Sequence, residues 1–84
     1  MQDVPPYITA AGEPLKYAGL NAVGLKRRGF SKEAMNLLRR AYRLIYRSRL
    51  STRHALQIIR DTVEPIPEVL AVVDFIEKSH RGII

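Results

Sequence analysis

The spacing of apolar residues divides the chain near residue 20. Beyond that point apolar side chains recur every three or four positions, which is the period of a helix with one buried face. The first 20 residues lack this period, and Pro5 and Pro6 favour an extended backbone at their own positions and just before them. We therefore predict an all-α fold, a small bundle of about four helices in residues 21–84, preceded by an extended segment in residues 1–20.

The first two predicted helices each begin at a capping residue. Asn21 can cap a short helix that ends at Gly29, because glycine readily adopts the left-handed conformation that closes a helix. Gly24 inside it costs about 1 kcal/mol relative to alanine, so we expect something to exclude a side chain there. Close backbone packing is the preferred reason, ahead of close approach by a ligand. Ser31 caps the second helix, which should run to about Arg47.

Two further helices complete the predicted bundle and share its core. Ser51 or Thr52 can cap the third helix, and Pro67 suits the first turn of a fourth helix that Gly82 ends. Short connections favour roughly antiparallel packing. The positions expected to face the core are Ala34, Leu37, Leu38, Ala41, Leu44, Ile45, Ala55, Leu56, Ile59, Val63, Val69, Leu70, Val72, Val73 and Ile76.

Charge gives the first indication of function. The chain carries a formal net charge of +6, and its excess of Lys and Arg lies mainly between residues 26 and 53, where Glu33 is the only acid. A field this uneven attracts anionic partners and speeds their encounter. The same arginines are equally consistent with an ordinary solvated surface.

Length and composition restrict the chemistry that this chain can perform. A chain of 84 residues forms one small domain. It has no Cys, no apolar run long enough to span a membrane and no signal-peptide features at its start, so we expect a cytoplasmic protein. His54 and His80 lack the neighbours of a catalytic triad or metal site, and no glycine-rich phosphate loop is present. We therefore expect no catalytic residue, cofactor or metal.

The first predicted helix carries the best binding constellation. On its surface Gly24 shares a side with Asn21, Arg27 and Arg28, so an amide and two guanidiniums flank bare backbone. A guanidinium fork suits a phosphate group, and an amide can pair with a base edge or a sugar hydroxyl. The alternative interpretation is a helix cap, a packing glycine and two solvated arginines.

The sequence also resembles a known family. Residues 19–31, Gly-Leu-Asn-Ala-Val-Gly-Leu-Lys-Arg-Arg-Gly-Phe-Ser, strongly resemble the C-terminal domain of the acyl carrier protein–UDP-N-acetylglucosamine O-acyltransferases. The likeness continues through residues 41–47, 67–69, 74–75 and 79–82, and so covers nearly the whole chain. Residues 3–7, Asp-Val-Pro-Pro-Tyr, look like the last coil of that family's parallel β-helix. The resemblance thus implies that residues 1–20 are an exit segment from a β-helix domain.

This resemblance implies a role in lipid A biosynthesis. Members of the family are cytoplasmic homotrimers that move an (R)-3-hydroxyacyl chain from acyl carrier protein to the 3-hydroxyl of UDP-N-acetylglucosamine. Their general base is a histidine on the β-helix, so neither His54 nor His80 takes that role. The chain is therefore expected to bind and dock substrates, and to be inactive as an acyltransferase by itself.

Particular residues can be carried over from the family. Asn21 matches a position that contacts the nucleotide, and Arg27 and Arg28 match an arginine pair that contacts substrate phosphate and carrier protein. Some relatives have a glutamate where this chain has Val23, so a hydrogen bond of that carboxylate is missing here. Acyl carrier proteins are strongly acidic, which makes several cations candidates for docking them. These are Lys26, Arg39, Arg40, Arg43 and Arg47.

Two other interpretations stay open. A small basic helical module could bind nucleic acid by neutralising phosphates. No helix shows the combination of Asn, Gln and Arg that reads base edges, and no aromatic stacking platform is evident, so DNA is not the expected partner. The chain could also be an interaction or trimerisation domain without a ligand. A ligand role requires Arg27 and Arg28 to be accessible and free of ion pairs within the chain, and we predict both.

Overall fold

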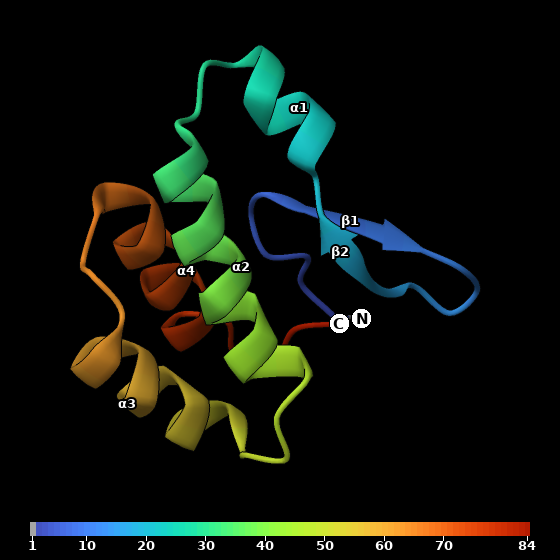
Figure 1. Ribbon diagram of the computed structural model, residues 1–84. Coiled ribbons are helices and arrows are strands. Elements are labelled where there is room, and N and C mark those ends of the chain that lie inside the picture. Colours follow the sequence, from blue (N-terminus) through green and yellow to red (C-terminus); the bar gives the residue numbers. More distant parts are fainter. Residues whose placement is uncertain (1) are drawn as a thin grey trace.

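A β-hairpin followed by four helices makes up the protein, whose computed structural model describes residues 2–84 (Figure 1). The elements are β1 Ile8–Ala11, β2 Lys16–Leu20, α1 Ala22–Arg27, α2 Lys32–Tyr46, α3 Thr52–Thr62 and α4 Pro67–Glu77. Helix α2 is central, with α3 and α4 packed on one side of it and the hairpin on the other. The fold is mostly helical, and the hairpin makes the predicted all-α class only approximate.

The helices begin where local capping chemistry places them. Asn21, Ser31 and Ser51 each accept a hydrogen bond through the side-chain oxygen from the backbone N–H three residues later, at 3.3, 3.0 and 3.1 Å. Each bond satisfies a donor that a helix would otherwise leave unpaired. Pro67 occupies the first turn of α4, and Gly29 follows α1 with a φ of 85°. These starts confirm the predicted ones.

The end of α4 differs from the prediction. The helix stops at Glu77, and Lys78 caps it, so Gly82 lies beyond the end of the helix and does not terminate it. His80 consequently sits outside α4, in an exposed turn. The chain leaves the helix early because residues 79–84 run back to the N-terminal segment, where Asp3 and Ile83 form a parallel β-bridge.

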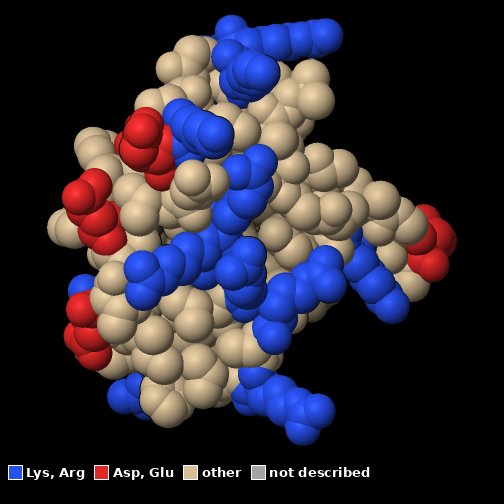
Figure 2. All heavy atoms as spheres, viewed as in Figure 1, with Lys and Arg blue, Asp and Glu red and all other residues tan. Residues whose placement is uncertain are grey.

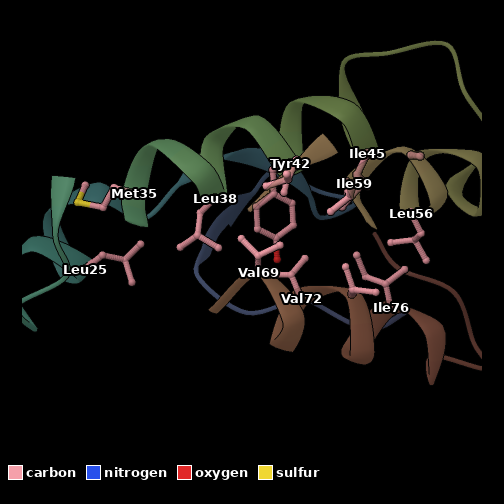
Figure 3. Packing of buried hydrophobic residues seen from close by; sticks show 14 residues of the cluster. Leu25, Met35, Leu38, Tyr42, Ile45, Leu56, Ile59, Val69, Val72 and Ile76 are labelled. Carbon is pink, nitrogen blue, oxygen red and sulfur yellow. The ribbon is translucent and has the colours of Figure 1, made fainter. Parts of the chain in front are cut away.

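One hydrophobic core lies between α2, α3 and α4, and Leu25 of α1 closes one end of it (Figure 3). Met35 and Tyr42 are buried although the predicted stripe of α2 omitted them, because the buried face is turned slightly around the helix. Leu70 was predicted to be buried but is 51% exposed. Helix α4 carries apolar residues on most of its sides, with only three acids among them, so periodicity decided poorly which side meets α2. The buried set is Leu25, Met35, Leu38, Ala41, Tyr42, Ile45, Ala55, Leu56, Ile59, Val63, Val69, Val72, Val73 and Ile76.

Most of the segment predicted to be extended is folded into an antiparallel hairpin. Its register pairs Ile8 with Leu20 and Ala10 with Tyr17, with an irregularity between the two pairs. Leu20 and Tyr17 are three residues apart, so in a regular strand they would face opposite sides of the sheet. The bulge lets both side chains pack against the helical core, as Ile8 does.

Two contacts tie the N-terminal segment to the helices. The hydroxyl of Tyr42 in α2 donates a 2.6 Å hydrogen bond to the carbonyl of Pro6. At the chain ends, which lie together in Figure 1, the Asp3 carboxylate accepts a 2.6 Å bond from the Ser79 hydroxyl and pairs with Arg81. These hydrogen bonds hold the pKa of Asp3 below its usual value.

The two stacked tyrosines of α2 should respond oppositely to loss of their hydroxyls. Tyr42→Phe should cost about 1–3 kcal/mol of unfolding free energy, because the Pro6 carbonyl loses its partner. The Tyr46 hydroxyl is buried with no hydrogen-bond partner among residues 2–84, and burial raises the pKa of Tyr46 to about 12. Tyr46→Phe should therefore be neutral or stabilise by up to about 1 kcal/mol. Urea unfolding followed by circular dichroism measures both variants, and equal losses would contradict the assignment.

Candidate substrate-binding surface

The start of α1 is built around the contact between Asn21 and Gly24. The Asn21 Oδ1 accepts the Gly24 N–H at 3.3 Å, and a Cβ at position 24 would lie 2.6 Å from the Asn21 Nδ2. The asparagine side chain therefore folds over the glycine and occupies the space that a methyl group would take. The predicted reason for the glycine, close packing of another backbone, is wrong, because the cap itself excludes the side chain.

The Asn21 side chain keeps one functional group for other partners. Its backbone N–H donates to the Tyr7 carbonyl at 2.8 Å, which anchors the residue to the N-terminal segment. Its Oδ1 serves the cap, while the Nδ2 group makes no hydrogen bond within residues 2–84. Asn21 is exposed, so two amide N–H donors face solvent at the start of α1.

Arg27 and Arg28 stand at the opposite end of α1. Both are exposed, and neither forms an ion pair within the described chain, as predicted. The Arg28 guanidinium carbon lies 5.6 Å from the centroid of the Phe30 ring, whose edge-to-face partner is Tyr7, also at 5.6 Å. Six residues of helix rise separate Asn21 from Arg27, a span of about 9 Å. The Asn21 amide and the two guanidiniums thus lie at opposite ends of α1.

The cations predicted to dock a carrier protein lie along the outer side of α2 and beside it. Lys26, Arg39, Arg40, Arg43 and Arg47 are all exposed. Figure 2 shows Lys and Arg gathered in a continuous run down the middle of this face, with Asp and Glu confined to its margins. The three ion pairs within residues 2–84 use other cations, namely Arg60, Lys78 and Arg81. The run therefore has no internal counter-charge.

Two shallow hollows flank Arg39 on this surface. One, of about 450 Å³, lies between α1 and α2; its apolar lining includes Val23, Phe30 and Met35, with Lys26 among the cations at its rim. The other, of about 260 Å³, lies between β2 and α2. Each is lined by residues from two different elements, so spacing within one element could not have found them.

No His, Cys, Asp or Glu of the described residues lines either of these two hollows. His54 is exposed in the first turn of α3, as predicted, and makes no side-chain hydrogen bond within residues 2–84. It lines a third hollow, of about 620 Å³, together with Arg60 and Glu77, which pair with each other. Across the described residues no group of three or more His, Cys, Asp or Glu could hold a metal ion, and no helix is both long and apolar enough to cross a membrane.

Fold and surface together define a small, mostly helical domain with an exposed amide and a run of unpaired cations. It belongs to a family described as UDP N-acetylglucosamine O-acyltransferase, domain 2, which matches residues 3–84. An acyl-[acyl-carrier-protein]–UDP-N-acetylglucosamine O-acyltransferase from Thermodesulfovibrio yellowstonii is 45% identical over 82 residues, covering 98% of this chain and 32% of the relative. The chain thus spans about a third of that relative's length.

Solved structures agree with this membership. A UDP-N-acetylglucosamine acyltransferase from Bacteroides fragilis is 49% identical and superposes with a TM-score of 0.98 over 100% of this chain and 33% of its own. An Arabidopsis UDP-N-acetylglucosamine acyltransferase is 38% identical, with a TM-score of 0.87 over 99% of this chain and 32% of its own. The hairpin and helices described above are therefore a shared arrangement that recurs in bacteria and plants.

Replacing Gly24 by alanine should displace the Asn21 side chain with little change in stability. Alanine gains about 1 kcal/mol of helix propensity, while loss of the cap costs about 1 kcal/mol, so the two effects nearly cancel. Asn21→Ala removes the cap without adding helix propensity at position 24, so it should lower the unfolding free energy by about 1 kcal/mol. Urea unfolding gives the free energies, and the NMR shifts of the Asn21 side-chain amide report its displacement. A loss well above about 2 kcal/mol for Gly24→Ala would show that the added methyl meets more than the cap.

Proposed function

We propose that this chain is the C-terminal substrate-binding and carrier-docking domain of an acyltransferase of lipid A biosynthesis. That enzyme transfers an (R)-3-hydroxyacyl chain from acyl carrier protein to the 3-hydroxyl of UDP-N-acetylglucosamine. The observation that carries the proposal is the family match over residues 3–84, together with 45% identity to an acyltransferase named for both substrates.

The nucleotide is proposed to bind at α1. Its diphosphate needs cationic donors, and Arg27 and Arg28 are exposed guanidiniums without an anionic partner among residues 2–84. Its sugar and base offer carbonyl and hydroxyl acceptors, which the free Nδ2 donors of Asn21 suit. The Asn21 side chain is held by its bond to the Gly24 N–H, and its backbone is held by its bond to the Tyr7 carbonyl. The Nδ2 group is therefore already positioned, which lowers the entropy cost of binding.

The carrier protein is proposed to dock along α2. Cations at positions 39, 43 and 47 recur at intervals of four residues, so they follow one side of the helix with Arg40 beside them. An acidic partner would meet a surface whose charges are all of one sign, which favours rapid encounter and correct orientation. Lys26 of α1 extends this docking face toward the proposed nucleotide site.

The rest of the enzyme is proposed to supply the catalytic base. The relatives are about three times as long, and a catalytic base from the β-helix implied by the resemblance would complete the reaction. Residues 1–20 would then connect that β-helix to the helical domain of residues 21–84, in a cytoplasmic homotrimer. In this arrangement the chain binds the nucleotide and the carrier protein, and the β-helix carries the catalytic base.

Binding to acyl carrier protein should be electrostatic and should depend on α2. We expect the 84-residue chain to bind the carrier in an NMR titration, with affinity that falls as salt is raised from 50 to about 200 mM. Arg40→Glu should weaken binding by about tenfold, since it replaces an attraction with a repulsion. The matched control, Arg53→Glu, changes an exposed arginine of α3 and should have little effect. Binding to duplex DNA with equal affinity would favour the nucleic-acid alternative, and no binding to either would favour a plain interaction domain.

Arg28 should matter for catalysis and not for folding. In a full-length enzyme that carries this domain, Arg28→Ala should lower kcat/KM for UDP-N-acetylglucosamine by about 10- to 150-fold, the equivalent of one charge-assisted hydrogen bond of about 1.5–3 kcal/mol. The thermal stability should change by no more than about 0.5 kcal/mol, because the side chain is exposed. Parallel losses of stability and activity would show that Arg28 is structural.

A further inference from the structure

The hollow between β2 and α2 concentrates positive charge around one aromatic ring. Arg39, Arg43 and Arg47 line it from α2, and Tyr17, Gly19 and Leu20 line it from β2. We call this site the tyrosine hollow. At about 260 Å³ it has room for a small tetrahedral anion together with part of the group that bears it.

Tyr17 forms a fixed floor for the tyrosine hollow. Its ring stacks on that of Tyr46, with centroids 4.2 Å apart and planes within 6°, and also on that of Tyr42 at 5.9 Å. Tyr42 is fully buried, so the hydrophobic core anchors the inner ring of this stack. A ring held on one face by two others presents its remaining edge and its hydroxyl in a constant position.

The three arginines converge on this floor. The Arg47 guanidinium carbon lies 5.8 Å from the centroid of the Tyr17 ring. Burial raises the pKa of Tyr17, while the charges of Arg47, Arg39 and Arg43, which line the same hollow, act in the opposite direction. The neutral hydroxyl of Tyr17 is therefore a hydrogen-bond donor in a hollow that three arginines line.

The three arginines that line the tyrosine hollow have no counter-charge beside them. Arg60 pairs with Glu77 and Arg81 with Asp3, whereas Arg39, Arg43 and Arg47 form no ion pair within residues 2–84. Among the described residues, Asn36 is the one hydrogen-bond partner of these three side chains, and its oxygen accepts from Arg39 at 3.1 Å. Three like charges gathered without an acid repel one another, and an added anion relieves that repulsion.

We propose that the tyrosine hollow is a binding site for a phosphate ester, held by Arg39, Arg43 and Arg47 with the hydroxyl of Tyr17 as a further donor. Guanidinium forks match phosphate oxygens in pairs, and Leu20 offers an apolar wall beside the ester carbon. The inference rests on the proposed function for its partner alone: a carrier protein docked on α2 would present a covalently attached phosphate here. Because the tyrosine hollow lies among the docking cations and not at Asn21 and Arg28, we assign the phosphate to the carrier and not to the nucleotide.

The first experiment tests the anion site without any carrier. The 84-residue chain is titrated with diethyl phosphate and with glycerol 3-phosphate while the NMR signals of the Tyr17 ring are followed, and acetate at equal ionic strength is the control. We expect saturable shifts with a millimolar Kd for the phosphates only. Arg43→Gln should weaken binding by about three- to tenfold, whereas Arg53→Gln, on exposed α3, should leave it unchanged. Equal shifts with acetate, or equal loss in both variants, would overturn the site.

The second experiment separates this inference from the docking proposal. Carrier protein with its phosphate-linked prosthetic group should bind more tightly than the same carrier without it, and Arg43→Gln should abolish that difference. If both carriers bind equally and the small phosphates do not bind, docking stands and the tyrosine hollow is not a phosphate site. If the small phosphates bind but neither carrier does, the site stands and the docking function fails. Saturation of the Tyr17 shifts by UDP-N-acetylglucosamine instead would overturn the assignment to the carrier.

Discussion

The buried ring of Tyr42 is the contact on which the rest of the structure depends. It projects from α2 toward Val69 and Val72 of α4, while its hydroxyl reaches the Pro6 carbonyl on the far side of the core (Figure 3). This bond places the segment that carries Tyr7, whose carbonyl receives the backbone N–H of Asn21. A single core side chain thereby links the helical packing to the start of α1, where the nucleotide is proposed to bind.

Helix α2 has two different sides. One side supplies Leu38 and Tyr42 to the core, and the other carries the run of cations in Figure 2. A domain this small buries a limited fraction of its surface, so like charges without counter-ions reduce a stability that is already modest. The placement of Arg39, Arg43 and Arg47 along one side of α2 without counter-ions therefore accords with binding as their role.

Much of the fold could be predicted because its signals are local. The caps at Ser31 and Ser51 and the proline at the start of α4 act within one helical turn, and the structure uses each as predicted. Burial was less predictable. Leu70 faces solvent because α4 carries more apolar residues than the side that meets its neighbours can bury. The hairpin depends on a bulge that brings Tyr17 and Leu20 to the same side.

The candidate site, like the fold, has features that the sequence predicts and features that only the tertiary structure decides. The sequence by itself determined the mostly helical class, the excess of positive charge and the exposed pair Arg27 and Arg28, since each follows from composition or from spacing within one element. Tertiary structure alone decided that Tyr17 lies beneath Arg47, thirty positions along the chain, in a hollow between a strand and a helix. No periodic pattern encodes such a meeting, because it results from how a hairpin packs on a helix through side chains distant in sequence.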